Sequence, residues 1–253
     1  MNPFLVFGWE LHGLSKEQPR LLIICLAVLG LLSALNGVGR VQAGEPVRLA
    51  EQLEKYVEQR QSEFGKIPAE RKQQLEKLAL YIRSQTSAGQ PARLTFICTH
   101  NSRRSHMAQL WASVGAAHYG VKNVETFSGG TEATAFNPRA VAALQRAGLK
   151  IEQGPQKTNP RYKVFIGTTA EPLVCFSKVY DAEPNPKSDF CAVMTCAQAD
   201  KACPIVHGAS LRLVISYEDP KTTDGTPMEA TKYDERCAQI AREMLYAFSR
   251  VKS

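Results

Sequence analysis

The pattern of apolar and polar positions changes near residue 90. Before it, apolar residues recur every three or four positions among charged ones, which predicts amphipathic helices over residues 46–64 and 69–84. Ile67-Pro68 interrupts the pattern between them, and the polar stretch SQTSAGQP ends it. We therefore expect a helical hairpin and linker over residues 46–90, and favour core packing or a spacer role for it over a binding role.

After residue 92 short apolar runs alternate with helix-like segments. The runs LTFICT and VETFSGG predict buried strands, each followed by a helix, at residues 105–119 and 137–148. Pro138 suits the first turn of the second helix, and Gly148 suits its end. Further strands are expected at YKVFIG, LVCFSKV, DFCAVMTC and SLRLVISY, and a long helix at residues 228–251. This alternation predicts an α/β domain over residues 92–253, with a parallel sheet covered on both faces.

The first 43 residues follow a third pattern. Arg20 precedes an apolar run at residues 21–38, and Val41 and Ala43 supply the small residues of a cleavage site. We expect residues 1–43 to be a secretory signal peptide, or a membrane anchor through residues 21–38, since the run is nearly long enough to span a bilayer. Either makes the protein exported, periplasmic or membrane-anchored. A translation start further downstream would instead make it cytoplasmic.

The composition indicates which chemical class of ligand the protein binds. The apolar content of 44% and charged content of 22% are those of a globular protein. The net charge of +7 favours an anionic ligand, although Lys and Arg are scattered along the chain. Because no nucleic-acid-binding signature is present and aromatic and basic residues are not interleaved, nucleic acid is not an expected partner.

The candidate chemistry begins where the strand LTFICT ends. Cys98 is followed by a five-residue loop, by Arg104 and Ser105, and then by a helix. Loop amides at a helix N-terminus form a cradle for a tetrahedral oxyanion, which Arg104 can close with two hydrogen bonds. The same positive surroundings stabilise a Cys98 thiolate as nucleophile, with Ser105 donating to its sulfur. The alternative is that Cys98 is a buried cysteine at a strand end with no chemical role. The predicted strand before the loop and the predicted helix after it favour the nucleophile over this alternative.

The segment CTHNSRRSHMAQ resembles the phosphate-binding loop of the low-molecular-weight tyrosine phosphatase superfamily, especially its thioredoxin-coupled arsenate reductases. FSGGTEATAFNPRAVAALQRAG resembles that family's second strand and following helix. The resemblance implies a three-layer α/β fold around a mainly parallel four-stranded sheet. It also implies Cys98 as nucleophile, Arg104 as oxyanion clamp, Asn101 as loop organiser and Ser105 as thiolate partner. The oxyanion-binding residues implied are Thr99, His100, Asn101, Ser102, Arg103 and Arg104.

Three positions depart from the family pattern. His100 replaces a loop glycine, and Arg103 replaces a second loop cysteine found in many relatives. Gln109 stands where related arsenate reductases often have a Glu near a potassium site, so we expect no potassium ion. No other metal and no cofactor is expected.

The downstream cysteines favour a reductase. VMTCAQADKACPIV places Cys196 and Cys203 seven positions apart at the end of a predicted strand, and arsenate reductases carry a similar Cys-x6-Cys-Pro element. The resemblance implies that Cys98 attacks arsenate, that Cys196 then attacks the Cys98–arsenic adduct, and that arsenite leaves. Cys203 next attacks Cys196, which gives a redox-active disulfide for a thioredoxin-like reductant.

Two structural alternatives exist for this pair. Cys196 and Cys203 could form a structural disulfide in an oxidising compartment, or supply metal ligands together with His207. The remaining cysteines of the α/β domain, Cys175, Cys191 and Cys237, are expected to pack in the core.

Asp219-Pro220 resembles the family's general-acid loop. Asp219 would protonate the leaving oxygen of a phosphoester, or help to expel hydroxide from arsenate. Tyrosine phosphatases usually follow this Asp-Pro with aromatic residues, whereas Lys221, Thr222 and Thr223 follow here. This difference favours a small inorganic oxyanion.

The sequence thus supports three hypotheses. The favoured one is an arsenate reductase that uses Cys98, Cys196 and Cys203 in turn. The second is a phosphatase that hydrolyses phosphotyrosine or another phosphomonoester through a Cys98 phosphoenzyme. The third is a non-catalytic oxyanion-binding or redox-sensing module. In each, residues 154–189 contain an insertion, either an added hairpin or a lid.

Overall fold

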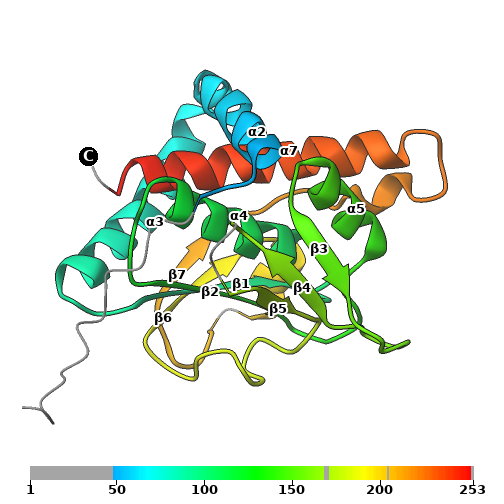
Figure 1. The fold of residues 1–253 in the computed structure, drawn as a ribbon. Helices are drawn as coiled ribbons and strands as arrows, with labels where there is room; N and C mark the ends of the chain where they lie inside the picture. Colours follow the sequence, from blue (N-terminus) through cyan, green and yellow to red (C-terminus); the bar gives the residue numbers. More distant parts are fainter. Residues whose placement is uncertain (1–47, 168–170, 204, 252–253) are drawn as a thin grey trace, which may run out of the picture. The chain divides into compact units, whose positions relative to one another are not determined.

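The computed structural model describes residues 48–167, 171–203 and 205–251 (Figure 1). The predicted signal peptide or membrane anchor, residues 1–43, lies outside the described residues. Within the described ranges, no helix combines the length and the apolar character needed to cross a bilayer.

A four-stranded parallel sheet forms the centre of the fold. Its strands are β1 (Ala92–Cys98), β2 (Val124–Gly130), β6 (Phe190–Met194) and β7 (Ala209–Val214), in the order β2-β1-β6-β7. All three pairings are parallel, which confirms the predicted sheet. Because the strands run in one direction, the carboxyl ends of β1 and β6 meet at the same edge of the sheet.

Helices cover both faces of this sheet. On one face α4 (Arg104–His118), which joins β1 to β2, packs in a common core with α3 (Ala69–Ser87) and α7 (Glu229–Ser249) (Figure 1). On the other face α6 (Ala197–Ala202), which joins β6 to β7, packs through Ala199 beside Tyr180 on a smaller apolar cluster. The two connections cross the sheet in opposite directions, so right-handed crossovers place their helices on opposite faces.

The helix after β2 is terminated as the sequence predicted. In α5 (Pro138–Arg146) the Asn137 side chain accepts a hydrogen bond from the amide of Arg139, and Pro138 occupies the first turn. Gly148 follows the helix at φ +101°. This left-handed conformation is one that a residue with a Cβ rarely adopts.

The predicted helical hairpin is present and belongs to the main core. Helix α2 (Glu51–Ser62) is joined to α3 through the 3-10 turn η1 (Phe64–Lys66). Tyr56 of α2 stacks on Trp111 of α4, with ring centroids 5.4 Å apart. The buried residues of the hairpin include Leu53, Val57, Leu75, Leu78 and Ile82. Because these side chains share one core with α4 and α7, the described residues form one compact unit.

The predicted insertion, residues 154–189, contributes two strands to a small separate sheet. Strands β3 (Lys150–Gln153), β4 (Tyr162–Phe165) and β5 (Leu173–Cys175) pair antiparallel in the order β3-β4-β5. Tyr162, Val164 and Cys175 point into the main core. Of the two alternatives for the insertion, an added hairpin or a lid, the antiparallel pair β4-β5 matches the hairpin. The sequence did not predict β3, because KIEQ contains a single apolar residue.

A substitution at Gly148 tests how closely α2 packs on the end of α5. A Cβ at this residue would lie 2.7 Å from the backbone nitrogen of Leu53 in α2. Gly148→Ala should therefore lower the free energy of unfolding by about 2–4 kcal/mol, through backbone strain and overpacking. Urea unfolding followed by circular dichroism measures this loss. Gly65→Ala is the control, since its Cβ would meet nothing within 4 Å. Equal losses in both variants would contradict the packing described.

Candidate active site

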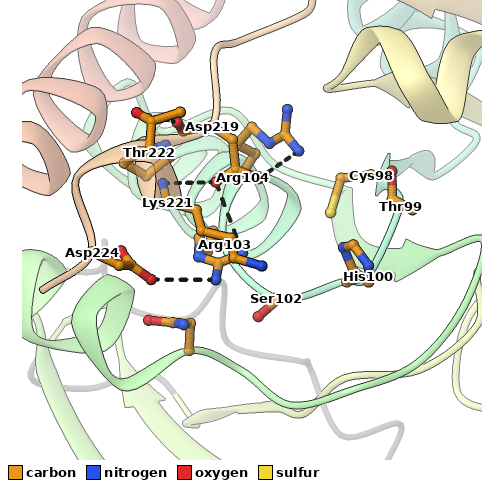
Figure 2. Close-up of polar contacts among 12 residues, drawn as sticks. Cys98, Thr99, His100, Ser102, Arg103, Arg104, Asp219, Lys221, Thr222 and Asp224 are labelled. Carbon is orange, nitrogen blue, oxygen red and sulfur yellow. Dashed lines mark hydrogen bonds and ion pairs between the residues drawn. The ribbon is translucent and has the colours of Figure 1, made fainter.

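Cys98 lies at the carboxyl end of β1 and is buried (Figure 2). Its Sγ is 3.2 Å from Ser105 Oγ in the first turn of α4. Asn101 Nδ2 donates to the same hydroxyl over 2.8 Å. Because Asn101 supplies a donor, the hydroxyl proton of Ser105 is left to point at the sulfur. The predicted nucleophile and its predicted partner are thus in contact.

Asn101 fixes the shape of the loop between β1 and α4. Its φ of 43° is left-handed, a conformation that Asn tolerates better than most residues. Its Oδ1 accepts a hydrogen bond from the backbone nitrogen of Lys178 over 2.9 Å. A Cβ at Gly130 would lie 2.7 Å from the Asn101 backbone nitrogen, so only glycine lets β2 pass this close.

The loop is held by its carbonyl groups. The carbonyls of Cys98, Thr99 and Ser102 accept hydrogen bonds from the backbone nitrogens of residues 131, 132 and 137. Among the residues that the structure describes, none of the hydrogen bonds between loops and turns is donated by an amide of residues 99–103. No side chain caps the N-terminus of α4. These N–H groups are therefore available to a tetrahedral anion.

Arg104 and Asp219 come together at this loop. Arg104 Nη2 donates to Asp219 Oδ2 over 2.9 Å, and Nη1 donates to the carbonyl of Tyr217 over 3.0 Å. The Asp219 side chain also caps the 3-10 turn η2 (Pro220–Thr223) by accepting from the Lys221 amide. The predicted clamp and the predicted general acid thus share one site.

Cys196 and Cys203 stand at the two ends of α6. Cys196 is fully buried and caps the helix, since its Sγ accepts from the Ala199 amide over 3.3 Å. The same sulfur lies 3.5 Å from Thr99 Oγ1, directly after Cys98. Cys203, at the other end, is partly exposed. Both are free thiols.

Comparison with known proteins identifies the family. Residues 93–162 match the low molecular weight phosphotyrosine protein phosphatase family. The arsenate reductase of Brevibacillus brevis is 30% identical over 147 residues, which cover 58% of this chain and 90% of that protein. The chain belongs to the low-molecular-weight protein tyrosine phosphatase superfamily. The resemblance predicted from the sequence is confirmed, and the chain is an enzyme.

Other members of the superfamily are more distant. The arsenate reductase of Bacillus licheniformis is 27% identical over 154 residues, 61% of this chain and 92% of that protein. The solved arsenate reductase structure from Archaeoglobus fulgidus is 17% identical with a TM-score of 0.41, and the match covers 62% of this chain and 98% of that one.

Three loop residues use their side chains elsewhere. His100 Nε2 lies 2.9 Å from Glu132 Oε1 at the protein surface. Ser102 Oγ donates to the carbonyl of Ala135 over 2.8 Å. Arg103 Nε donates to the hydroxyl of Tyr233 on α7 over 2.9 Å. All three side chains thus have partners outside the loop, and the three backbone amides donate none of the loop and turn hydrogen bonds found among the described residues.

Two buried residues beneath the loop were not predicted from the sequence. The first is His106, whose ring stacks on Phe136 at 4.0 Å between centroids and whose Nδ1 lies 3.1 Å from Ser128 Oγ. Burial, with the nearby Lys178 ammonium, holds the pKa of His106 well below its ordinary value, so the ring is neutral. The second is Lys178 itself, and burial lowers its pKa to about 8. The position of Lys178 inside the apolar run LVCFSKV was the one sequence signal that could have revealed a buried lysine.

The other cysteines behave as core residues. Cys175, Cys191 and Cys237 are free and buried. Burial raises the pKa of Cys175 and of Cys237 to about 12, so neither forms a thiolate at neutral pH. Within the described ranges, no group of three or more His, Cys, Asp and Glu side chains is arranged to hold a metal ion.

A groove of about 810 Å³ opens beside Arg104, between α6 and the Asp219 loop. The groove is lined by Arg104, Ala197, Gln198, Lys201, Ser216, Tyr217, Glu218, Asp219 and Thr222. No wall of exposed aromatic rings is present among these residues. The absence of such a wall agrees with the sequence after Asp219-Pro220, where Lys221, Thr222 and Thr223 follow instead of aromatic residues.

Ser105 should control the reactivity of Cys98. Ser105→Ala removes the hydroxyl next to the sulfur, and a hydrogen bond to a charged group contributes about 1.5–3 kcal/mol. We expect alkylation of Cys98 by iodoacetamide at pH 7 to slow roughly tenfold or more, measured by mass spectrometry of the Cys98 peptide. Ser102→Ala is the matched control, because its hydroxyl bonds to Ala135 instead. The interpretation fails if both variants react equally slowly.

Lys178 should make stability depend on pH. Its pKa is about 8 in the folded chain and about 10.4 in an unfolded one, so the unfolded chain binds more protons between these values. The contribution of Lys178 to stability therefore rises with pH across that window. We expect the stability of Lys178→Met relative to the native chain to fall by about 1–3 kcal/mol between pH 7 and pH 10.5. Urea unfolding at both pH values tests this, with the exposed Lys122→Met as control. A constant difference for Lys178→Met would contradict the prediction.

Proposed function

We propose that this enzyme reduces arsenate to arsenite through Cys98, Cys196 and Cys203. The observation that carries the proposal is the position of Cys196. Its buried thiol lies 3.5 Å from Thr99 Oγ1, the residue next to the nucleophile. A phosphatase has no need of a second thiol at this point. A reductase does, because reduction of arsenic from the +5 to the +3 state takes two electrons from a pair of thiols.

The first step forms a bond between sulfur and arsenic. The Cys98 thiolate attacks arsenate bound by the amides of the loop and by Arg104. A hydroxide is expelled from arsenic and leaves as water with a proton from Asp219. The arsenic is still in the +5 state, and Cys98 carries it as a covalent adduct.

The second and third steps move electrons. The Cys196 thiolate attacks Cys98 Sγ, a disulfide forms, and the electron pair of the sulfur–arsenic bond leaves with arsenic as arsenite. Cys203 then attacks Cys196, which restores the Cys98 thiolate and leaves a Cys196–Cys203 disulfide. A dithiol reductant of the thioredoxin type returns both sulfurs to thiols.

The third step requires α6 to unfold. Seven residues at the rise of an α-helix separate the Cα atoms of Cys196 and Cys203 by about 10 Å. A disulfide needs Cα atoms closer than about 7 Å. The helix has six residues and buries only Ala199. Arg212 holds its end by donating to the carbonyls of Asp200 and Cys203. Apart from these bonds from Arg212, few contacts oppose its opening.

The groove favours phosphomonoester hydrolysis as a second candidate function. A volume of about 810 Å³ beside Arg104 exceeds what a tetrahedral oxyanion needs, and leaves room for the organic group of a phosphoester. The leaving group would occupy this groove, whose lining offers no exposed aromatic ring for stacking. Asp219 would then protonate that leaving group, and Cys98 would carry the phosphoryl group.

Parallel assays on the full chain, kept reduced, distinguish the two functions. Arsenate-dependent NADPH oxidation is measured with thioredoxin and thioredoxin reductase, and p-nitrophenyl phosphate hydrolysis is measured alongside. We expect Cys98→Ser to abolish both activities. Cys196→Ser and Cys203→Ser should lower arsenate turnover at least a hundredfold, about 2.7 kcal/mol, and leave hydrolysis intact.

Cys191→Ala, a change at a buried cysteine outside the site, is the control and should retain both activities. Hydrolysis by the native chain without any arsenate turnover would overturn the reductase proposal in favour of the phosphatase. Loss of arsenate reduction in Cys191→Ala as severe as in Cys203→Ser would remove the evidence for a specific relay.

A further inference from the structure

Asp219 lies between two arginines, of which the proposed reaction uses only one. Arg104 Nη2 is 2.9 Å from Asp219 Oδ2, and Arg103 Nη1 is 3.8 Å from Asp219 Oδ1. Figure 2 shows the two guanidinium groups reaching the Asp219 segment from neighbouring positions of the loop. Arg103 therefore forms a second ion pair with the predicted general acid.

Arg103 is itself held firmly. Its side chain is 11% exposed, and its Nε donates to the hydroxyl of Tyr233, which is completely buried. Tyr233 in turn donates to Asp224 Oδ1 over 2.9 Å, and Arg103 Nη2 is 3.9 Å from Asp224 Oδ2. Both carboxylates around Arg103 thus belong to one segment, residues 219–224. The arginine joins this segment to the oxyanion loop and to α7.

The geometry sets two anions in competition for Arg104. Arg104 is 5% exposed, and its buried Nε has no hydrogen-bond partner among the described residues. An oxyanion that binds Arg104 with two prongs, through Nε and Nη2, takes the Nη2 donor that now pairs with Asp219. The Asp219 side chain is only 27% exposed. A carboxylate in such surroundings is costly to leave without a cation. A second guanidinium nearby reduces that cost, and Arg103 supplies it.

We propose that Arg103 is a positioning residue that keeps Asp219 at the oxyanion loop while Arg104 binds the oxyanion. Asp219 shifts its ion pair from Arg104 to Arg103 when the ligand arrives, and stays within reach of the leaving group. The inference rests on the proposed function only in requiring that the loop binds an oxyanion. It needs neither arsenate reduction nor phosphoester hydrolysis.

A double-mutant cycle tests the coupling of Arg103 to Asp219. Inorganic phosphate is titrated into the reduced full chain by isothermal titration calorimetry, so no turnover is required. We expect Asp219→Asn to tighten phosphate binding, because it removes the competing carboxylate. Arg103→Ala should weaken binding about tenfold in the native background, and less than threefold in the Asp219→Asn background.

Matched variants separate this role from charge and from folding. Arg139→Ala removes a guanidinium that pairs with Asp224 and Glu229, and for which no contact with Asp219 is found. It should change phosphate affinity less than threefold. Arg103→Lys should recover most of the native affinity. Arg103→Gln keeps an amide donor for Tyr233, and replaces Arg103→Ala in the cycle if that variant fails to fold.

Three results would overturn the proposal. One is an equal loss of phosphate affinity from Arg103→Ala in the native and in the Asp219→Asn backgrounds. Arg103 would then act on the phosphate only through its positive charge, and not through Asp219. Another is weaker phosphate binding in Asp219→Asn, because Asp219 would then not compete for Arg104. The last is a loss in Arg139→Ala as large as in Arg103→Ala. Because the double-mutant cycle measures phosphate binding and not turnover, it decides the role of Arg103 even if the protein does not reduce arsenate.

Discussion

The site depends on keeping the backbone amides of one loop free of partners inside the protein. An oxyanion cradle needs its N–H groups to point inward, so the loop has to be fastened by its other atoms. Here the fastening comes from carbonyls that accept from residues 131–137 and from the left-handed turn at Asn101. The Asn101 side chain then reaches Ser105 on one side and the Lys178 amide on the other. The sheet, α4 and the segment after β5 all contribute to this one conformation.

Much of the fold could be predicted because its elements are strongly periodic. β1, α4 and α5 have continuous apolar runs or faces with clear start and stop residues. α6 was not predicted, because AQADKA is polar and buries only Ala199. β3 was missed for the same reason, since Ile151 is its one buried residue. Short elements that owe their conformation to neighbours leave little trace in the sequence.

The residues of the site also fall into those that the sequence could predict and those that it could not. Cys98, Asn101, Arg104 and Ser105 lie within eight positions, so the motif itself specifies their neighbourhood. The contact of Thr99 with Cys196 spans 97 positions, and that of Arg103 with Tyr233 spans 130. No periodicity encodes such pairs, because they follow from how parallel strands and α7 are assembled. Arg103 was noticed as a departure from the family, but its partners could be found only in three dimensions.

The short helix α6 has a thermodynamic consequence beyond its place in the chain. Its thiols can join only when the helix is open, so the equilibrium between dithiol and disulfide is linked to local folding. Any contact that stabilises α6, such as those from Arg212, lowers the tendency of Cys196 and Cys203 to become oxidised. Ala199 also covers part of the second face of the sheet, so opening the helix exposes apolar surface there. Redox state and surface hydrophobicity are therefore coupled variables in this chain.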